Sequence, residues 1–88
     1  MVKYEIFIKP SARKELQCVG TKRDRQKIVA AIQALAAEPR PIGSQKLVGT
    51  DDCFRIRTGD YRIIYEIVDV VVSVTVIRVA HRKDAYRR

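Results

Sequence analysis

The sequence predicts an α+β domain in which two N-terminal helices pack on one face of a twisted, largely antiparallel four-stranded sheet. Apolar residues recur at helical spacing between residues 10 and 37. They alternate at strand spacing in residues 2–8, 54–67 and 71–79. The resulting order is strand, helix, helix and then three strands. The 88 residues contain no linker or internal repeat, so we expect one domain spanning residues 1–88.

Short local signals define the first strand and the two helices. Pro10 suits the first turn of a helix, because its missing N–H needs no partner there, and Gly20 is placed to end that helix. Thr21 is the expected N-cap of the second helix, which runs to about Ala37, before Pro39. The first strand buries one side, formed by Val2, Tyr4, Ile6 and Ile8. The second helix buries a stripe formed by Ile28, Val29, Ile32, Leu35 and Ala36.

Residues 54–67 form a predicted hairpin that turns at Gly59–Asp60, two residue types that tolerate a tight turn. A two-residue turn sets the pairs Thr58–Tyr61, Arg57–Arg62, Ile56–Ile63, Arg55–Ile64 and Phe54–Tyr65. Because side chains alternate across a strand, one face can be buried, and it carries Phe54, Ile56, Ile63 and Tyr65. The other face carries Arg55, Arg57 and Arg62.

A polar connection over residues 41–52 precedes the hairpin, and a last strand over residues 71–79 follows it. This last strand is apolar on both sides and is therefore expected to be central in the sheet. We expect its buried face to hold Val72, Val74 and Val76, and its other face to place Ser73, Thr75 and Ile77 beside the arginines. The C-terminal tail, AHRKDAYRR, would leave the strand next to the arginine face.

The net charge of +8 and the pI near 9.9 favour a polyanionic partner. Cys18 and Cys53 are isolated and are expected to be small buried hydrophobes rather than a disulfide. One histidine and no paired metal-ligand spacing argue against a zinc site, so no metal or cofactor is expected. No apolar run is long enough to span a membrane and no signal peptide is present, which predicts a cytoplasmic protein without membrane association.

The opposed pair Arg57–Arg62, with Arg55 beside it, is unusual because like charges facing each other destabilise a sheet. One interpretation is a solvated strand face. The other is a pocket that receives an anion, for which a nucleic-acid phosphate is the first candidate, because guanidinium groups fork onto phosphate oxygens.

These residues suit metal-independent cleavage of RNA, in which the 2′-hydroxyl attacks the adjacent phosphorus. Arginine neutralises charge but cannot act as a base, so His81 or Tyr86 would have to move protons. Histidine, with an ordinary pKa of ~6.5, is the easier candidate. Tyrosine, with an ordinary pKa of ~10, would need arginines around it to lower that value. Glu66, on the same predicted face, is a third candidate, although a salt bridge to Arg55 is the commoner role for such a residue.

The hairpin CFRIRTGDYRIIYEI, the valine-rich strand after it and the tail segment AHRKDAY together resemble the RelE/ParE superfamily of bacterial and archaeal toxins. Within that superfamily the resemblance is to the RelE branch. It extends over nearly the whole chain and includes the N-terminal strand, the helical pair and Gln45-Lys46-Leu47. It implies the family fold, a helical hairpin against a twisted antiparallel sheet.

The resemblance implies a toxin of a type II toxin–antitoxin system that enters the ribosomal A site and cuts mRNA there without a metal. By motif position, the implied catalytic residues are Arg55, Arg57, Arg62, Arg82 and Tyr86. The residues expected to contact RNA are Lys46, His81, Lys83 and Arg87. The first arginine pair is often lysine in the family, so a lysine acid/base role is lost here. The implied partners are a cognate antitoxin, in a hetero-oligomer, and the ribosome with its mRNA.

Two other functions stay open. One is a ParE-like toxin of the same fold that inhibits DNA gyrase, and the other is a basic RNA-binding module without chemistry. The tail with His81, Arg82 and Tyr86 favours the nuclease, because ParE-like proteins generally lack the complete set of basic residues and tyrosine.

Overall fold

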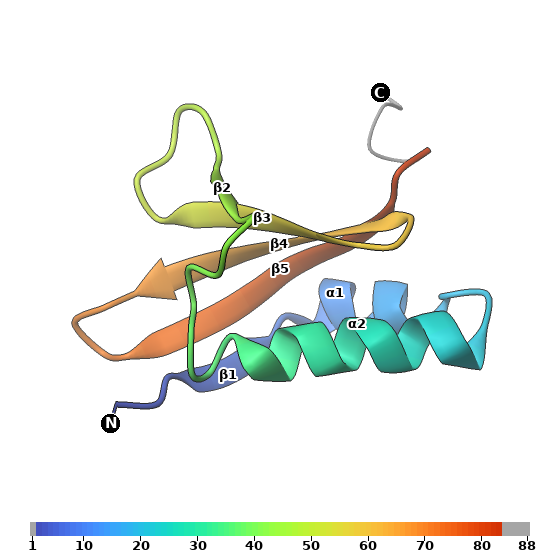
Figure 1. Cartoon of the computed structure of the whole chain (residues 1–88), viewed down its shortest axis with the longest axis horizontal. Coiled ribbons are helices and arrows are strands. Elements are labelled where there is room, and N and C mark those ends of the chain that lie inside the picture. Colours follow the sequence, from blue (N-terminus) through green and yellow to red (C-terminus); the bar gives the residue numbers. More distant parts are fainter. Residues whose placement is uncertain (1, 84–88) are drawn as a thin grey trace.

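The computed structural model describes residues 2–83 and confirms an α+β domain, with two helices beneath a twisted sheet (Figure 1). The strands are ordered β1-β5-β4-β3-β2; β1 is parallel to β5, and the other neighbours are antiparallel. The N-terminal strand therefore joins a sheet that is otherwise built from the C-terminal half. The elements are β1 (Glu5–Ile8), α1 (Pro10–Gln17), α2 (Lys22–Ala34), β2 (Gln45–Lys46), β3 (Cys53–Thr58), β4 (Tyr61–Val68) and β5 (Ser73–His81).

The sheet has five strands rather than the four expected from the sequence, because β2 pairs with β3. Gln45 lies opposite Arg55 and Lys46 opposite Phe54, and the Leu47 N–H donates to the Cys53 carbonyl at 2.9 Å. Two residues are too few to produce a recognisable alternation, so this strand was included in the polar connection.

The two predicted helix starts are confirmed, but Gly20 does not end the first helix, because α1 stops at Gln17 with Cys18 as its C-cap. Pro10 is the first residue of α1, and the Thr21 hydroxyl accepts a hydrogen bond from the Asp24 N–H at 3.1 Å as the N-cap of α2. The regular part of α2 ends at Ala34, earlier than expected, and the chain then tightens into i→i+3 hydrogen bonds up to Ala37.

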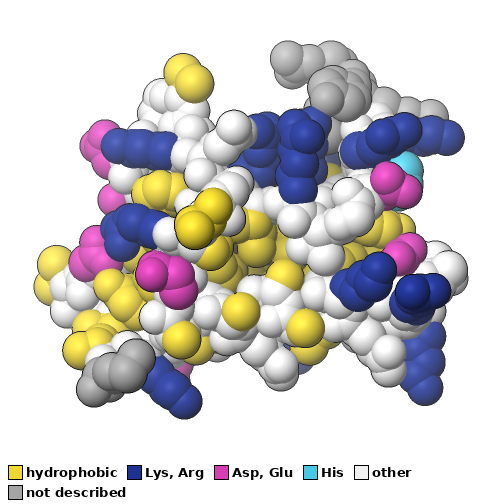
Figure 2. Space-filling model, in the orientation of Figure 1, with side chains coloured by type: hydrophobic (Ala, Val, Ile, Leu, Met, Phe, Trp, Pro, Cys, Tyr) yellow, Lys and Arg dark blue, Asp and Glu magenta, His cyan; other side chains and the backbone are white. Residues whose placement is uncertain are grey.

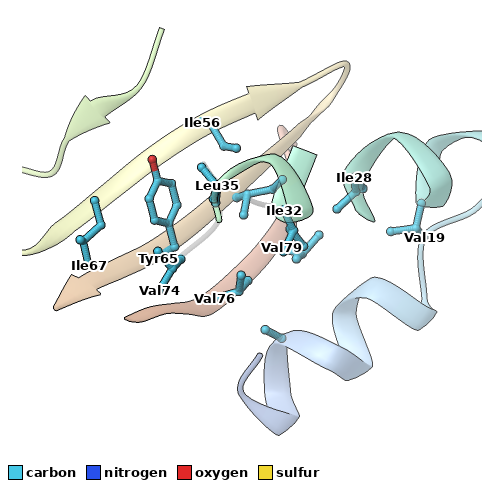
Figure 3. Close-up of a cluster of buried hydrophobic side chains, with 12 residues drawn as sticks. Val19, Ile28, Ile32, Leu35, Ile56, Tyr65, Ile67, Val74, Val76 and Val79 are labelled. Atoms are coloured by element: carbon cyan, nitrogen blue, oxygen red, sulfur yellow. The ribbon is translucent and has the colours of Figure 1, made fainter. Parts of the chain in front are cut away.

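The core lies between the helices and the sheet (Figure 3). Tyr65 is its largest fully buried side chain, and the Tyr65 hydroxyl donates to the Pro39 carbonyl at 2.7 Å, while burial raises the pKa of Tyr65 to about 12. The other members are Ala12, Val19, Ile28, Ile32, Leu35, Ile56, Ile63, Ile67, Val74, Val76 and Val79. The predicted stripe of α2 contributes Ile28, Ile32 and Leu35 to this core. Tyr4, Ile6 and Ile8 pack against it as expected, whereas Val2 is exposed because β1 begins only at Glu5.

The last strand differs from its prediction in phase. The pairing of β4 with β5 shifts after Ile64, which faces Arg78, whereas Tyr65 faces Val76, so Ile77 is an extra residue in a β-bulge. Side chains beyond the bulge exchange faces, and Val79 becomes buried opposite Ile63. Val72, which was expected on the buried face, instead lies in the turn before β5 with a φ of 54°.

A charged cluster ties together the end of the sheet remote from Gly59. The Tyr4 hydroxyl donates to Asp69 Oδ1 at 2.6 Å, and Arg40 forms an ion pair with Asp69 Oδ2 at 2.9 Å. The hydrogen bond from Arg40 is the main reason that the pKa of Asp69 is lowered from its ordinary value. The guanidinium of Arg40 also lies 5.3 Å from the centre of the Phe54 ring. The cluster joins the N-terminal segment, the connection after α2 and the β4–β5 turn.

The two cysteines are free thiols, as expected, but neither is fully buried. Cys18 is exposed because it follows the last residue of α1 at the surface, and Cys53 is partly exposed at the start of β3. Among residues 2–83, no helix is both long enough and apolar enough to cross a membrane.

Candidate functional site

A pocket of about 360 Å³ lies where the tip of the β3–β4 hairpin meets the end of β5. Its lining contains four cationic side chains and one carboxylate, so its net charge is strongly positive. Figure 2 shows Lys and Arg side chains gathered along the upper edge of the molecule, above the sheet. We call this the arginine pocket; it is lined by Arg57, Gly59, Asp60, Tyr61, Arg62, Arg82 and Lys83.

The hairpin places two of these arginines. Gly59, with a φ of 58°, forms the tight turn with Asp60, and the register sets Arg57 opposite Arg62, as predicted. On the next strand Ala80 lies opposite Arg62, so its small side chain adjoins the pair. Residues that lie opposite one another on neighbouring strands form a row across the sheet, and their side chains point to the same face. The row of Arg57, Arg62 and Ala80 points away from the helices.

The third arginine comes from the segment after β5. The Arg82 N–H donates to the Asp60 carbonyl at 2.7 Å, which fixes the backbone of Arg82 at the hairpin turn. Lys83 follows it in the lining of the pocket. The pocket thus combines residues from two turns of the chain that are far apart in sequence. Three of the five predicted catalytic residues meet there.

Three other predicted site residues, Arg55, Lys46 and His81, lie outside the arginine pocket. Arg55 shares the open face of the sheet but lies opposite Ile64, and it donates a hydrogen bond to Oε1 of Gln45. Lys46 is exposed on the edge strand β2, opposite Phe54. The remaining predicted residues, Tyr86 and Arg87, lie outside the residues that the structure describes.

His81 was expected beside the arginines, but its side chain points to the other face. It lies opposite Tyr61, in the row next to Arg62, and adjacent rows face opposite ways. The two rings meet edge to face, with centroids 5.1 Å apart and planes at 88°. His81 also lines a separate cavity of about 150 Å³ with Glu15 and Cys18. The bulge at Ile77 causes this, since without it the alternation along β5 would turn the imidazole to the open face.

Glu66 lies opposite Cys53, at the far end of β3 from the arginine pocket, and Arg55 bonds to Gln45 instead. Among residues 2–83, no group of three or more His, Cys, Asp or Glu side chains is arranged to hold a metal ion. The pocket itself offers donors and positive charge, which is the chemistry that binds a phosphate and stabilises charge building up on it.

Two features were missed in the sequence. Asp60 was treated only as a turn residue and Tyr61 only as a strand residue, although both line the arginine pocket. The signal in the sequence was their position at the hairpin turn, next to the predicted catalytic residue Arg62. The second feature is a groove of about 550 Å³ between α2 and β3, which no local pattern indicates. It is lined mainly by Ala31, Ala34, Leu35, Pro41, Ile42, Arg55, Ile56 and Arg57.

The fold agrees with comparisons to known proteins. Residues 6–86 match the family described as the ParE toxin of type II toxin–antitoxin systems. The chain is also 33% identical to toxin RelG of Mycobacterium tuberculosis, a similarity that covers 97% of this chain and 98% of that protein. The chain therefore belongs to the RelE/ParE family of toxins from type II toxin–antitoxin systems.

Its solved relatives are RelE toxins. The toxin–antitoxin complex RelBE2 of Mycobacterium tuberculosis matches with a TM-score of 0.81 and 30% identity, covering 93% of this chain and 94% of that one. The RelE–RelB complex of Pyrococcus horikoshii gives a TM-score of 0.81 with 28% identity, covering 92% and 97%. The isolated RelE toxin of E. coli gives 0.77 with 29% identity, covering 89% and 83%.

Proposed function

We propose that this protein is a ribosome-dependent, metal-independent mRNA endonuclease that inhibits translation. The observation that supports this is the convergence of Arg57, Arg62 and Arg82 on one pocket. Guanidinium groups that share one pocket repel one another, and the pocket contains four cationic side chains against one carboxylate. A phosphate in the pocket would offset that repulsion.

In the proposed reaction, the 2′-hydroxyl oxygen of a nucleotide attacks the adjacent phosphorus. The bond from phosphorus to O2′ forms and the bond to the 5′-oxygen of the next nucleotide breaks. The proton of the 2′-hydroxyl passes to a base, and the leaving oxygen gains a proton. Arg57, Arg62 and Arg82 would neutralise the phosphorane oxygens. On the family resemblance, Tyr86 would move a proton.

The proposed inhibitor is a cognate antitoxin bound in a hetero-oligomer. RelE relatives were crystallised with RelB antitoxins. Here the groove between α2 and β3 offers the exposed apolar side chains of Ala34 and Ile42, with the basic side chains of Arg55 and Arg57 outnumbering the one carboxylate, Glu38. A segment that combines apolar and acidic residues would fit it. Arg57 lines both the groove and the arginine pocket, so such a segment would engage a proposed catalytic residue.

Mapping the 5′ ends of cellular mRNA after induction tests the proposal. New 5′ ends within translated codons, absent when translation initiation is blocked, are the expected result. The match to the ParE toxin family favours gyrase inhibition as the alternative. A gyrase supercoiling assay inhibited by the purified protein, together with unchanged mRNA ends, would establish that alternative.

Binding to ribosomes is expected to weaken steeply with salt, because counterions are released when basic side chains neutralise phosphates. With about four phosphates neutralised, the affinity should fall by at least ~10-fold between about 50 and 200 mM salt. Exchanging Arg57 and Arg82 for Gln should flatten this dependence. The matched control, in which Lys22 and Arg23 on α2 become Gln, removes the same charge and should flatten it less. Equal effects would show that net charge, and not the pocket, governs binding.

A further inference from the structure

The segment that carries Arg82 is held by two hydrogen bonds that backbone N–H groups donate. The Arg82 N–H donates to the Asp60 carbonyl at 2.7 Å, and the Lys83 N–H donates to Nδ1 of His81 at 3.1 Å. The second bond closes a tight turn, in which the His81 side chain accepts a hydrogen bond from the backbone N–H of Lys83, two residues later. Together they determine how the chain turns as it leaves β5.

The imidazole that accepts this bond is itself held in place. Its ring meets the Tyr61 ring edge to face, at 5.1 Å between centroids, and it lines the small cavity with Glu15 and Cys18. Tyr61 in turn packs against the core. Acceptance at Nδ1 requires the other ring nitrogen, Nε2, to carry the proton of the neutral ring.

We propose that His81 is a positioning residue of the nuclease site: its Nδ1 holds the backbone of Lys83, and this keeps the side chain of Arg82 in the arginine pocket with Arg57 and Arg62. The inference rests on the proposed function for its effect on cleavage. It gives the histidine a role other than proton transfer or RNA contact. Both of those roles would require the imidazole on the open face, whereas its row faces the helices.

Replacing His81 by Asn, Gln and Ala separates these roles. An Asn side-chain oxygen lies close to the place of Nδ1 and accepts readily from the N–H two residues later, as in an Asx-turn. A Gln oxygen lies nearer the place of Nε2. His81→Asn should therefore cleave within about threefold of the wild type. His81→Gln and His81→Ala should each be slower by about five- to tenfold, the effect of one lost hydrogen bond.

If His81 were a general base, all three variants would lose ~10²–10⁴-fold, because none can accept the proton at neutral pH. That result would overturn the inference. So would an Asn variant as impaired as the Ala variant. Thermal unfolding midpoints of the three variants identify any loss that comes from misfolding, and Asn and Gln serve as matched polar replacements.

Hydrogen exchange of the Lys83 amide gives a readout that needs no cleavage. Protection is expected in the wild type and in His81→Asn, and faster exchange in His81→Gln and His81→Ala. Equal exchange in all four proteins would disprove the hydrogen bond and the inference with it. If the wild type cuts no mRNA, the endonuclease proposal fails by itself, and the exchange series still decides whether His81 holds this turn.

Discussion

Arg62→Ala is expected to reduce mRNA cleavage by ~10²–10³-fold, the usual cost of removing one group that stabilises charge in a transition state. The thermal unfolding midpoint should stay equal or rise slightly, because the substitution removes a guanidinium that faces Arg57 across the hairpin. This combination of lost activity and retained stability is typical of a residue selected for function. Single-turnover cleavage on programmed ribosomes and a thermal unfolding curve measure the two effects.

Arg78→Ala is the matched control. Arg78 is also a strand arginine, but it pairs with Glu15 at 3.4 Å and does not line the arginine pocket. Cleavage by this variant should stay near the wild-type rate. Arg62 would be structural if its Ala variant were unfolded, and incidental if that variant cut mRNA at the normal rate.

If the phenol transfers a proton, Tyr86→Phe is expected to slow single-turnover cleavage by ~10²–10⁴-fold. Tyr86→Ala should then be only a little slower than Tyr86→Phe. Phe keeps the ring and removes only the hydroxyl, whereas Ala removes both. A ring that only stacks on a base would give the opposite pattern, with Phe near normal and Ala clearly impaired. The pair of variants therefore separates the two roles of the residue.

The His81 variants complete this assignment. Near-normal cleavage by Tyr86→Phe, combined with a severe defect in every His81 variant, would move the proton-transfer role from the tyrosine to the histidine. The orientation of the imidazole toward the helices argues for the opposite outcome.

The hairpin could be predicted pair by pair because its information is local. Gly59–Asp60 defines the turn, and the alternation of apolar and basic residues on both sides fixes the register. The same local information placed Arg57 opposite Arg62. The helix starts were predicted nearly as well, since Pro10 and Thr21 act on their own helix ends, whereas both helices end earlier than expected.

The phase of the last strand was predicted wrongly beyond Val76, because simple alternation allows for no extra residue in the strand. Arg78 was the available signal, because simple alternation would place it on the buried face with Val74 and Val76. The bulge at Ile77 leaves Arg78 exposed instead, where it pairs with Glu15. The bulge changes the residues that follow it, because Val79 and His81 lie on the opposite face from the one that simple alternation predicts. The pocket itself depends on this phase and on the contact between Arg82 and Asp60, which joins distant parts of the chain.

The position of β5 has a consequence for the synthesis of the protein. This strand lies between β1 and β4, contributes Val74, Val76 and Val79 to the core, and is made last. The N-terminal strand β1 has no other neighbour in the sheet, so it cannot pair until β5 has been synthesised. A growing chain can therefore complete neither its core nor the arginine pocket until β5 and Arg82 have emerged from the ribosome. Pairing over such sequence distances is slow, so the order of the strands delays formation of the arginine pocket until β5 and Arg82 have been synthesised.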